Sequence, residues 1–301
     1  MVPISTATFS KALWPGVNKW YGKTYNEFKT EYTAVYETQK SNKAWEERVS
    51  ISGFGLALEK PEGEAISYDF AQQGYLDRSI HVVYGLGFGV TREAVEDNQY
   101  KETAFTKASE LAYSMRQTKE VLAMQPLNRA FNNNYLYGDG KELIATDHPN
   151  VAGGTWSNEL TVAADVSETA FEDACIQIGK YTNDRGMRIA VRPKSLLIPV
   201  DLDFDVNKIL KTEFEVGTNN NTVNIVRQRF PGGVNINHYL TDTDAWFIQT
   251  DVPNGGVHWE RRADSFEMDK DFSTDNALYK ATARYSFMWY DKKAIFGSEG
   301  A

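Results

Sequence analysis

Apolar and polar residues alternate along two stretches in the first third of the chain. The first stretch runs from Arg48 to Leu58, and the second ends in six apolar residues at every second position: Ile80, Val82, Tyr84, Leu86, Phe88 and Val90. A period of two is typical of β-strands, because successive side chains point to opposite faces. Residues 59–64 between them are polar and contain proline and glycine, which indicates a turn. The pattern predicts a hairpin over residues 48–90 with a charged tip.

A hairpin of this length has little neighbouring chain to bury it. Isolated two-stranded hairpins are marginally stable in water. It must therefore pack either on its own domain or on a neighbouring subunit, and the pattern alone leaves both alternatives open.

Three glycines, Gly85, Gly87 and Gly89, stand where a nucleotide-binding glycine motif would lie, between a strand and a helix. Their spacing does not fit that motif, because its third glycine would fall on Val90, and no βαβ unit follows. Glycines on one face of a strand more often allow another backbone to approach closely. We favour that interpretation over a nucleotide site.

After the hairpin, the period changes to three and four residues. Thr91 is a suitable N-cap, and Pro126 should end or kink the helix. Some 34 residues would form a rod of about 50 Å. The stripe of apolar positions along it comprises Ala94, Val95, Ala104, Phe105, Ala108, Leu111, Ala112, Met115 and Leu122. So long a helix in a chain of this size indicates an elongated subunit.

The sequence pattern of the second half of the chain predicts a mixed α/β unit. This unit begins after a loop-like boundary at residues 138–164. A helix capped by Asp165 or Ser167 should end near Asp184-Arg185-Gly186, and Asp201 should cap a second helix. Strands are expected over residues 187–198, 223–226, 233–238, 245–249, 257–261, 266–272 and 281–289. The fold class is α+β.

Composition narrows the function classes. The chain has 301 residues, with 32 Lys and Arg against 41 Asp and Glu, a net charge of −9 that argues against a strongly basic nucleic-acid binder. The single cysteine, Cys175, excludes an intrachain disulfide and lies on a predicted core stripe. The N-terminus does not resemble a signal peptide, and no apolar stretch is long enough to cross a membrane. Aromatic residues make up 13% of the chain, which suits either a core or subunit interfaces.

Candidate chemistry is sparse. The four histidines, His81, His148, His238 and His258, show no zinc-binding spacing. The Asp242 and Asp244 pair indicates a turn, and no nucleophile, P-loop or kinase motif is present. We therefore expect no enzyme activity and no catalytic, cofactor-binding or metal-ligating residues. A soluble enzyme with a diffuse acidic site remains a competing hypothesis.

Several strings, in order over residues 45–297, resemble the major capsid proteins of tailed bacteriophages, and the Mu-like head subunits in particular. They are Tyr137-Gly138-Asp139-Gly140 with Ala145-Thr146-Asp147-His148-Pro149, Asp184-Arg185-Gly186 with Val191-Arg192-Pro193-Lys194-Ser195-Leu196-Leu197-Ile198-Pro199, Asn221-Thr222-Val223-Asn224-Ile225-Val226, Asn237-His238-Tyr239-Leu240-Thr241-Asp242 with Ala245-Trp246-Phe247, and Arg284-Tyr285-Ser286-Phe287 with Trp289-Tyr290-Asp291. His238 departs from the family pattern, which often has proline there. Encapsulin shells share this fold.

The resemblance implies a structural subunit that assembles into the hexamers and pentamers of an icosahedral phage head around DNA. It implies an N-terminal arm (1–47), an extended hairpin loop (48–90), a peripheral domain with a spine helix (91–134 and 261–301) and an axial domain (135–260). The hairpin would contact a neighbouring subunit through Glu59, Lys60, Pro61, Glu62, Tyr68, Phe70 and Arg78.

The resemblance also implies partners and a location. The partners would be copies of the chain, a separate scaffolding protein, the portal and weakly, non-specifically bound DNA, with no membrane and no cofactor. The subunit would assemble in the bacterial host cytoplasm and reside in the virion. The alternative is an encapsulin-like compartment that loads enzyme cargo.

Overall fold

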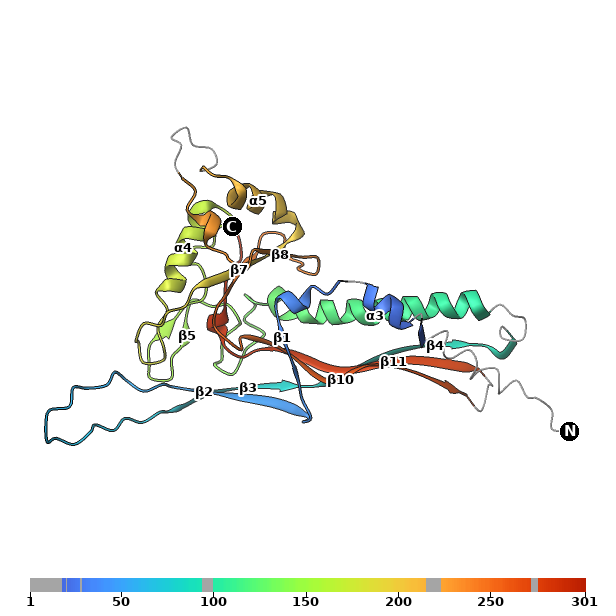
Figure 1. Cartoon of the computed structure of the whole chain (residues 1–301), viewed down its shortest axis with the longest axis horizontal. Coiled ribbons are helices and arrows are strands. Elements are labelled where there is room, and N and C mark those ends of the chain that lie inside the picture. The colour runs from blue at the N-terminus through green and yellow to red at the C-terminus, as the bar shows by residue number, and fades with distance from the viewer. Residues whose placement is uncertain (1–17, 20, 28, 94–99, 215–222, 272–275) are drawn as a thin grey trace.

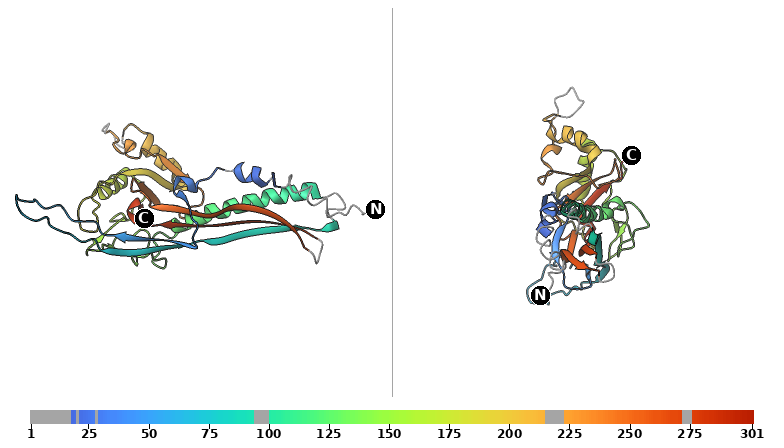
Figure 2. Two further views of the ribbon diagram at one scale, coloured as in Figure 1. Left: turned by 60° about the horizontal axis from the view of Figure 1, so that its bottom comes forward. Right: turned by 90° about the vertical axis from the view of Figure 1, so that its right-hand side faces the viewer.

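The computed structural model describes residues 18–301 except 20, 28, 94–99, 215–222 and 272–275, and side chains of residues 100–105 are outside the description as well. The molecule is elongated (Figure 1). A long sheet and a long helix lie side by side along its main axis, an α/β unit stands on one side of them, and a thin arm leaves at the end of the molecule away from β4. The second view in Figure 2 shows the same separation of arm, sheet and α/β unit.

The long sheet has the strand order β1-β10-β11-β4. β1 (Glu37–Lys40) runs parallel to β10 (Gly256–Lys270), whereas β11 (Ala277–Trp289) is antiparallel to both β10 and β4 (Val82–Val90). The three glycines of β4 face β11 closely: a Cβ on Gly87 would lie 2.6 Å from the carbonyl oxygen of Tyr279. Close backbone approach is confirmed for Gly87, whereas the nearest atoms to Gly85 and Gly89 belong to the side chains of Thr282 and Leu278.

Helix α3 (Tyr100–Asn128) covers one face of this sheet. Ala108, Leu111, Ala112 and Met115 are buried on that face, as the apolar stripe predicted. Arg92 and Glu93 are helical, which agrees with the predicted start near Thr91. The stripe positions Ala94 and Val95, and the side chains of Ala104 and Phe105, lie outside the description. Pro126 does not end the helix: the helix continues to Asn128, because Leu127 is buried and holds the last turn in the core.

The α/β unit contains the second sheet, with the order β12-β9-β7-β8. Its strands are β7 (Pro193–Pro199), β8 (Val234–Asn237), β9 (Trp246–Thr250) and β12 (Ile295–Ser298), and its helices are α4 (Glu168–Gly179) and α5 (Asp203–Lys211). Short 3₁₀ turns occupy Tyr32–Ala34 (η1), Val200–Leu202 (η2), Val226–Gln228 (η3) and Lys292–Ala294 (η4), and β5 (His148–Pro149) pairs with β6 (Thr155–Trp156).

The helix boundaries predicted in this unit are only partly right. Of the two predicted caps of α4, Ser167 is confirmed, because its Oγ accepts the Ala170 N–H at 3.1 Å. The helix ends at Gly179, and Gly186 lies in a later turn instead of capping it. Asp201 lies in η2 and does not cap α5, whose N-cap is Leu202.

Some strands also differ from those that the sequence predicted. Residues 223–226 lead into a turn because the Asn224 side chain accepts the N–H groups of Val226 and Arg227, a local bonding pattern that competes with strand pairing. The two strands predicted over 257–261 and 266–272 are one bulged strand, β10, which ends at Lys270. Residues 187–192 precede β7, and β12 was not predicted at all.

One buried cluster joins the two sheets. It contains Met124 and Leu127 of α3, Leu197 and Phe247 of the second sheet, and Trp289 at the end of β11. A second cluster lies within the α/β unit around Phe171, Ile178 and Trp246, and the partly buried Cys175 packs against it. Burial raises the pKa of the Cys175 thiol. Cys175 is therefore a packing residue, as its position on the apolar stripe predicted.

Candidate functional site: an exposed arm and its root

The predicted hairpin exists, but its paired part is short. β2 (Trp45–Ile51) pairs with β3 (Gln73–Ile80) up to the Ile51–Gln73 position, and the Ser52 N–H donates to the Gln72 carbonyl at 2.9 Å. Residues 52–72, which we call the arm, then continue without a ladder to a turn in which Glu64 N donates to Pro61 O at 3.3 Å. The continuous strand predicted over 80–90 is divided: β3 pairs with β2, and β4 pairs with β11.

The arm exposes large apolar side chains. Six of them are 63–87% exposed: Phe54, Leu56, Leu58, Ile66, Tyr68 and Phe70. Single exposed apolar residues are common on proteins, but a group of this size along one segment marks a surface for interaction. The arm projects away from the rest of the chain, so its apolar side chains find little cover there (Figure 1).

The structure brings six of the seven predicted contact residues to the arm. Glu59, Lys60, Pro61 and Glu62 are exposed at its tip, and Tyr68 and Phe70 lie on the returning leg. Arg78 is instead at the root on β3, where it pairs with Glu47 and lies over the Trp45 ring at 5.6 Å. Whether these residues touch another subunit stays a prediction.

A buried ionic network anchors the root of the arm. Lys292 Nζ of η4 lies 2.6 Å from Asp77 Oδ2 of β3 and 3.9 Å from Asp139 Oδ1, and all three side chains are about 7% exposed. The Gly138 N–H donates to the other oxygen of Asp77 at 2.8 Å. Burial alone would raise the pKa of Asp139, but the hydrogen bond to His148 and the charge of Lys292 outweigh it, and the pKa is lowered. Asp139 therefore remains charged.

His148 and Asn158 complete this network. The Asn158 Nδ2 donates to the carbonyls of Leu143, Lys292 and Ile295, and its Oδ1 accepts the Ala145 N–H, which fixes the orientation of the amide. His148 Nε2 faces that Oδ1 at 3.0 Å, while its Nδ1 faces Asp139 Oδ2 at 2.8 Å. Both ring nitrogens of His148 therefore have hydrogen-bond partners inside the network.

The network explains the loop string that runs from Tyr137 to Pro149. Asp139 and His148 are its buried centre, and they tie the loop to β3 and to η4. Sequence reasoning missed Asp77, Asn158 and Lys292, because residues so far apart in the chain carry no local pattern. The only signal was the loop string itself.

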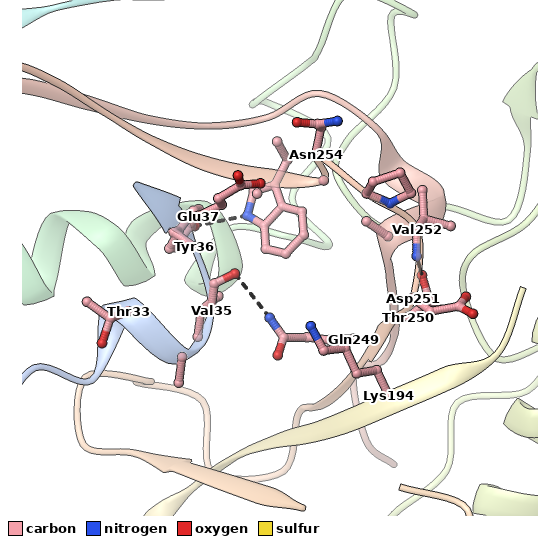
Figure 3. A pocket seen from close by; sticks show the side chains of 16 residues that line it. Thr33, Val35, Tyr36, Glu37, Lys194, Gln249, Thr250, Asp251, Val252 and Asn254 are labelled. Atoms are coloured by element: carbon pink, nitrogen blue, oxygen red, sulfur yellow. Dashed lines mark hydrogen bonds between the residues drawn. The ribbon is translucent and has the colours of Figure 1, made fainter. Parts of the chain in front are cut away.

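The polar cavity of Figure 3, about 350 Å³, lies where the η1 segment meets β9 and the start of β10. Gln249 Nε2 donates to the Val35 carbonyl at 3.1 Å, and Trp289 Nε1 donates to the Tyr36 hydroxyl at 2.9 Å. These bonds attach the η1 segment to both sheets. The cavity is a joint between elements, with its charged groups Glu37, Lys194 and Asp251 at the lining.

Other candidate residues have structural roles. His238 pairs with Glu31 at 2.7 Å, and Asp242 Oδ1 accepts the N–H groups of Asp244 and Ala245, which confirms a turn. The described part of the chain holds no group of three or more His, Cys, Asp or Glu residues suited to a metal ion. Nor does any helix in that part have the length and apolar character needed to span a membrane.

The comparisons with known proteins now decide the family. The family model described as "Phage capsid protein" matches residues 81–297. The chain belongs to the phage capsid protein family. It is a structural subunit of a phage capsid, as the sequence strings implied, while the Mu-like subtype stays a prediction. No curated protein matches the sequence of this capsid subunit.

Solved structures show the same fold. The procapsid of bacteriophage JBD30 is 17% identical, with a TM-score of 0.55 over 98% of this chain and 76% of that one. The native GTA particle capsid is 12% identical, with a TM-score of 0.56 over 91% of both chains. A virus-like particle from Pyrococcus furiosus is 12% identical, with a TM-score of 0.54 over 94% and 98%. At these identities the likeness shows the fold of the capsid subunit and not its particular assembly.

Proposed function

We propose that this chain forms the hexamers and pentamers of an icosahedral phage head that encloses DNA. The observation that carries the proposal is the arm: six large apolar side chains, 63–87% exposed, on a segment with no ladder of its own. Burying a side chain of this size is worth about 1.5–3 kcal/mol. A second copy of the chain supplies the missing cover, since shells repeat each contact by symmetry.

The proposed domains follow the sheets. Residues 18–47 and the arm flank a peripheral domain built on α3, β4, β10 and β11, and residues 135–260 form most of an axial domain. β12 lies outside that range but pairs with β9, so we include Ile295–Ser298 in the axial domain. The arm, with Glu59, Lys60, Pro61, Glu62, Tyr68 and Phe70, contacts the neighbouring subunit, and Arg78 stiffens its root.

Further partners belong to the same proposal. A separate scaffolding protein guides assembly in the bacterial host cytoplasm, the portal occupies one vertex, and DNA is held weakly, in keeping with the net charge of −9. The subunit carries no enzymatic activity.

Electron microscopy of the purified chain tests the proposal. We expect closed shells, formed with a scaffolding partner and able to hold DNA. Shells that carry a protein cargo would favour an encapsulin-like compartment instead, and a small discrete oligomer would contradict both. Uniform shells formed by the chain alone would contradict the need for separate scaffolding.

A further inference from the structure

Asp69 ties the two legs of the arm together. Its Oδ2 accepts the Gly55 N–H from the opposite leg at 2.7 Å, and its Oδ1 accepts the Phe70 N–H at 2.8 Å. Within the described residues, the backbone bonds across the arm are only those at Ser52 and at the tip turn. A single carboxylate therefore sets how the legs lie beyond the paired root.

Arg185 reaches the same carboxylate from the α/β unit. Its Nη1 lies 3.0 Å from Asp69 Oδ1 and 2.9 Å from Asp69 Oδ2, and its Nη2 donates to the Phe70 carbonyl. Three contacts from a planar guanidinium fix direction as well as distance. The N–H groups of Gly55 and Phe70, and then Arg185, lower the pKa of Asp69, so the pair is charged at neutral pH.

The turn that carries Arg185 is well braced. The Asn183 side chain accepts the N–H groups of Arg185 and Met187, both at 3.0 Å. Gly186 has φ +76°, a left-handed conformation that favours glycine, and its N–H donates to the Asn183 carbonyl at 2.9 Å. Asp184 is held by Lys293 at 3.6 Å. The string Asp184-Arg185-Gly186 was one of those that resemble phage capsid proteins, and the resemblance implied no role for it. In the structure it forms a hydrogen-bonded turn that holds Arg185 in place.

Little else fills the space beneath this contact. A cavity of about 560 Å³ separates the arm leg at Asp69 and Gln72 from the loop at Asn150–Gly153 and from the Arg185 turn. In the described chain, Arg185–Asp69 is the ion pair that crosses from the arm to the α/β unit. Beyond its anchored root, the described part of the arm is therefore joined to the α/β unit by this pair.

We propose that Arg185 is a positioning residue that, through Asp69, holds the arm in the direction from which it engages a neighbouring copy. The inference deepens the proposed function and rests on it. A partly exposed ion pair adds little to the stability of the whole subunit. Its effect is therefore to restrict the conformations of the arm.

Spin labels on the unassembled subunit test this inference. Labels at Glu62→Cys on the arm tip and Asn134→Cys beside α3, in a Cys175→Ser chain, report the tip-to-body distance by double electron–electron resonance. We expect Arg185→Gln or Asp69→Asn to broaden the distance distribution without moving the thermal midpoint. Lys208→Gln, which removes the exposed pair with Asp205, is the matched control and should leave it unchanged.

Assembly kinetics supply the second readout. With the arm loosened, assembly of Arg185→Gln should slow by roughly two- to fivefold, the range of one exposed ion pair. A distance distribution in Arg185→Gln as narrow as that of the native chain would overturn the role of the Arg185–Asp69 pair in holding the arm. A broad distribution with native assembly kinetics would overturn its role in assembly. A native chain that forms no shell even with its scaffolding partner would overturn the proposed function, while the spin-label result still decides whether the Arg185–Asp69 pair holds the arm.

Discussion

The sharpest prediction concerns Tyr68, which is 87% exposed on the arm. Replacing it with alanine removes no buried contact from the subunit, so the free energy of unfolding should change by less than about 0.5 kcal/mol. If a neighbouring subunit buries this ring, the change removes about 2 kcal/mol from each arm contact. In a shell, the arm of each subunit contacts one neighbour, and each subunit is contacted by the arm of another. The substitution therefore weakens one arm contact per subunit. At 1.4 kcal/mol per tenfold, the concentration threshold for assembly should rise roughly 30-fold.

The assay is light scattering over a dilution series of the subunit with its scaffolding partner at fixed concentration, with sedimentation to separate shells from free subunits. Thermal melting of the unassembled variant verifies that its fold is intact. Val162→Ala is the matched control, since Val162 is 74% exposed on a loop of the α/β unit outside the arm. A Tyr68→Ala threshold within twofold of the native value, with normal melting, would refute the assignment of the arm to the subunit contact.

Three further predictions concern stability of the unassembled subunit. Asn158→Ala leaves several buried partners unpaired and should cost about 3–5 kcal/mol in urea unfolding, against little change for exposed Asn134→Ala. Gly87→Val should lower the melting temperature because its Cβ meets a backbone oxygen at 2.6 Å, whereas Gly53→Ala, with open space around it, should not. Burial and then the charge of Lys119 lower the pKa of His258 to about 3, so the native state stays unprotonated while the unfolded chain binds a proton below pH 6.5. Stability should therefore fall by roughly 1 kcal/mol per pH unit from 6.5 towards 3, and His258→Phe should remove that slope; an equal slope in the variant would contradict it.

Periodic patterns predicted the elements that have a single dominant face. The stripe through Ala108, Leu111 and Met115 predicted the buried side of α3, and the alternation over 82–90 predicted β4. The glycines of β4 were correctly separated from a nucleotide motif because their spacing matched strand packing. These elements are determined by residues that are neighbours in sequence, so the local pattern carries the information.

Other features depend on partners far away in the chain. The arm alternates like a strand from Phe54 to Leu58, yet no ladder forms because no third strand lies beside it. The charged centre of the root joins Asp77, Asp139 and Lys292, and only the fold brings them together. Asn224 likewise favoured a turn through its own side chain, although β-branched neighbours at Val223 and Ile225 predicted a strand.

The central claim is that this chain forms a closed shell in which the arm of one subunit lies on another. Cryo-electron microscopy of the assembled particle measures it most directly. The account predicts icosahedral shells of hexamers and pentamers, with residues 52–72 covered by a neighbouring copy and Tyr68 and Phe70 buried there. A particle in which the arm stays exposed, or a small oligomer in place of a shell, would contradict it.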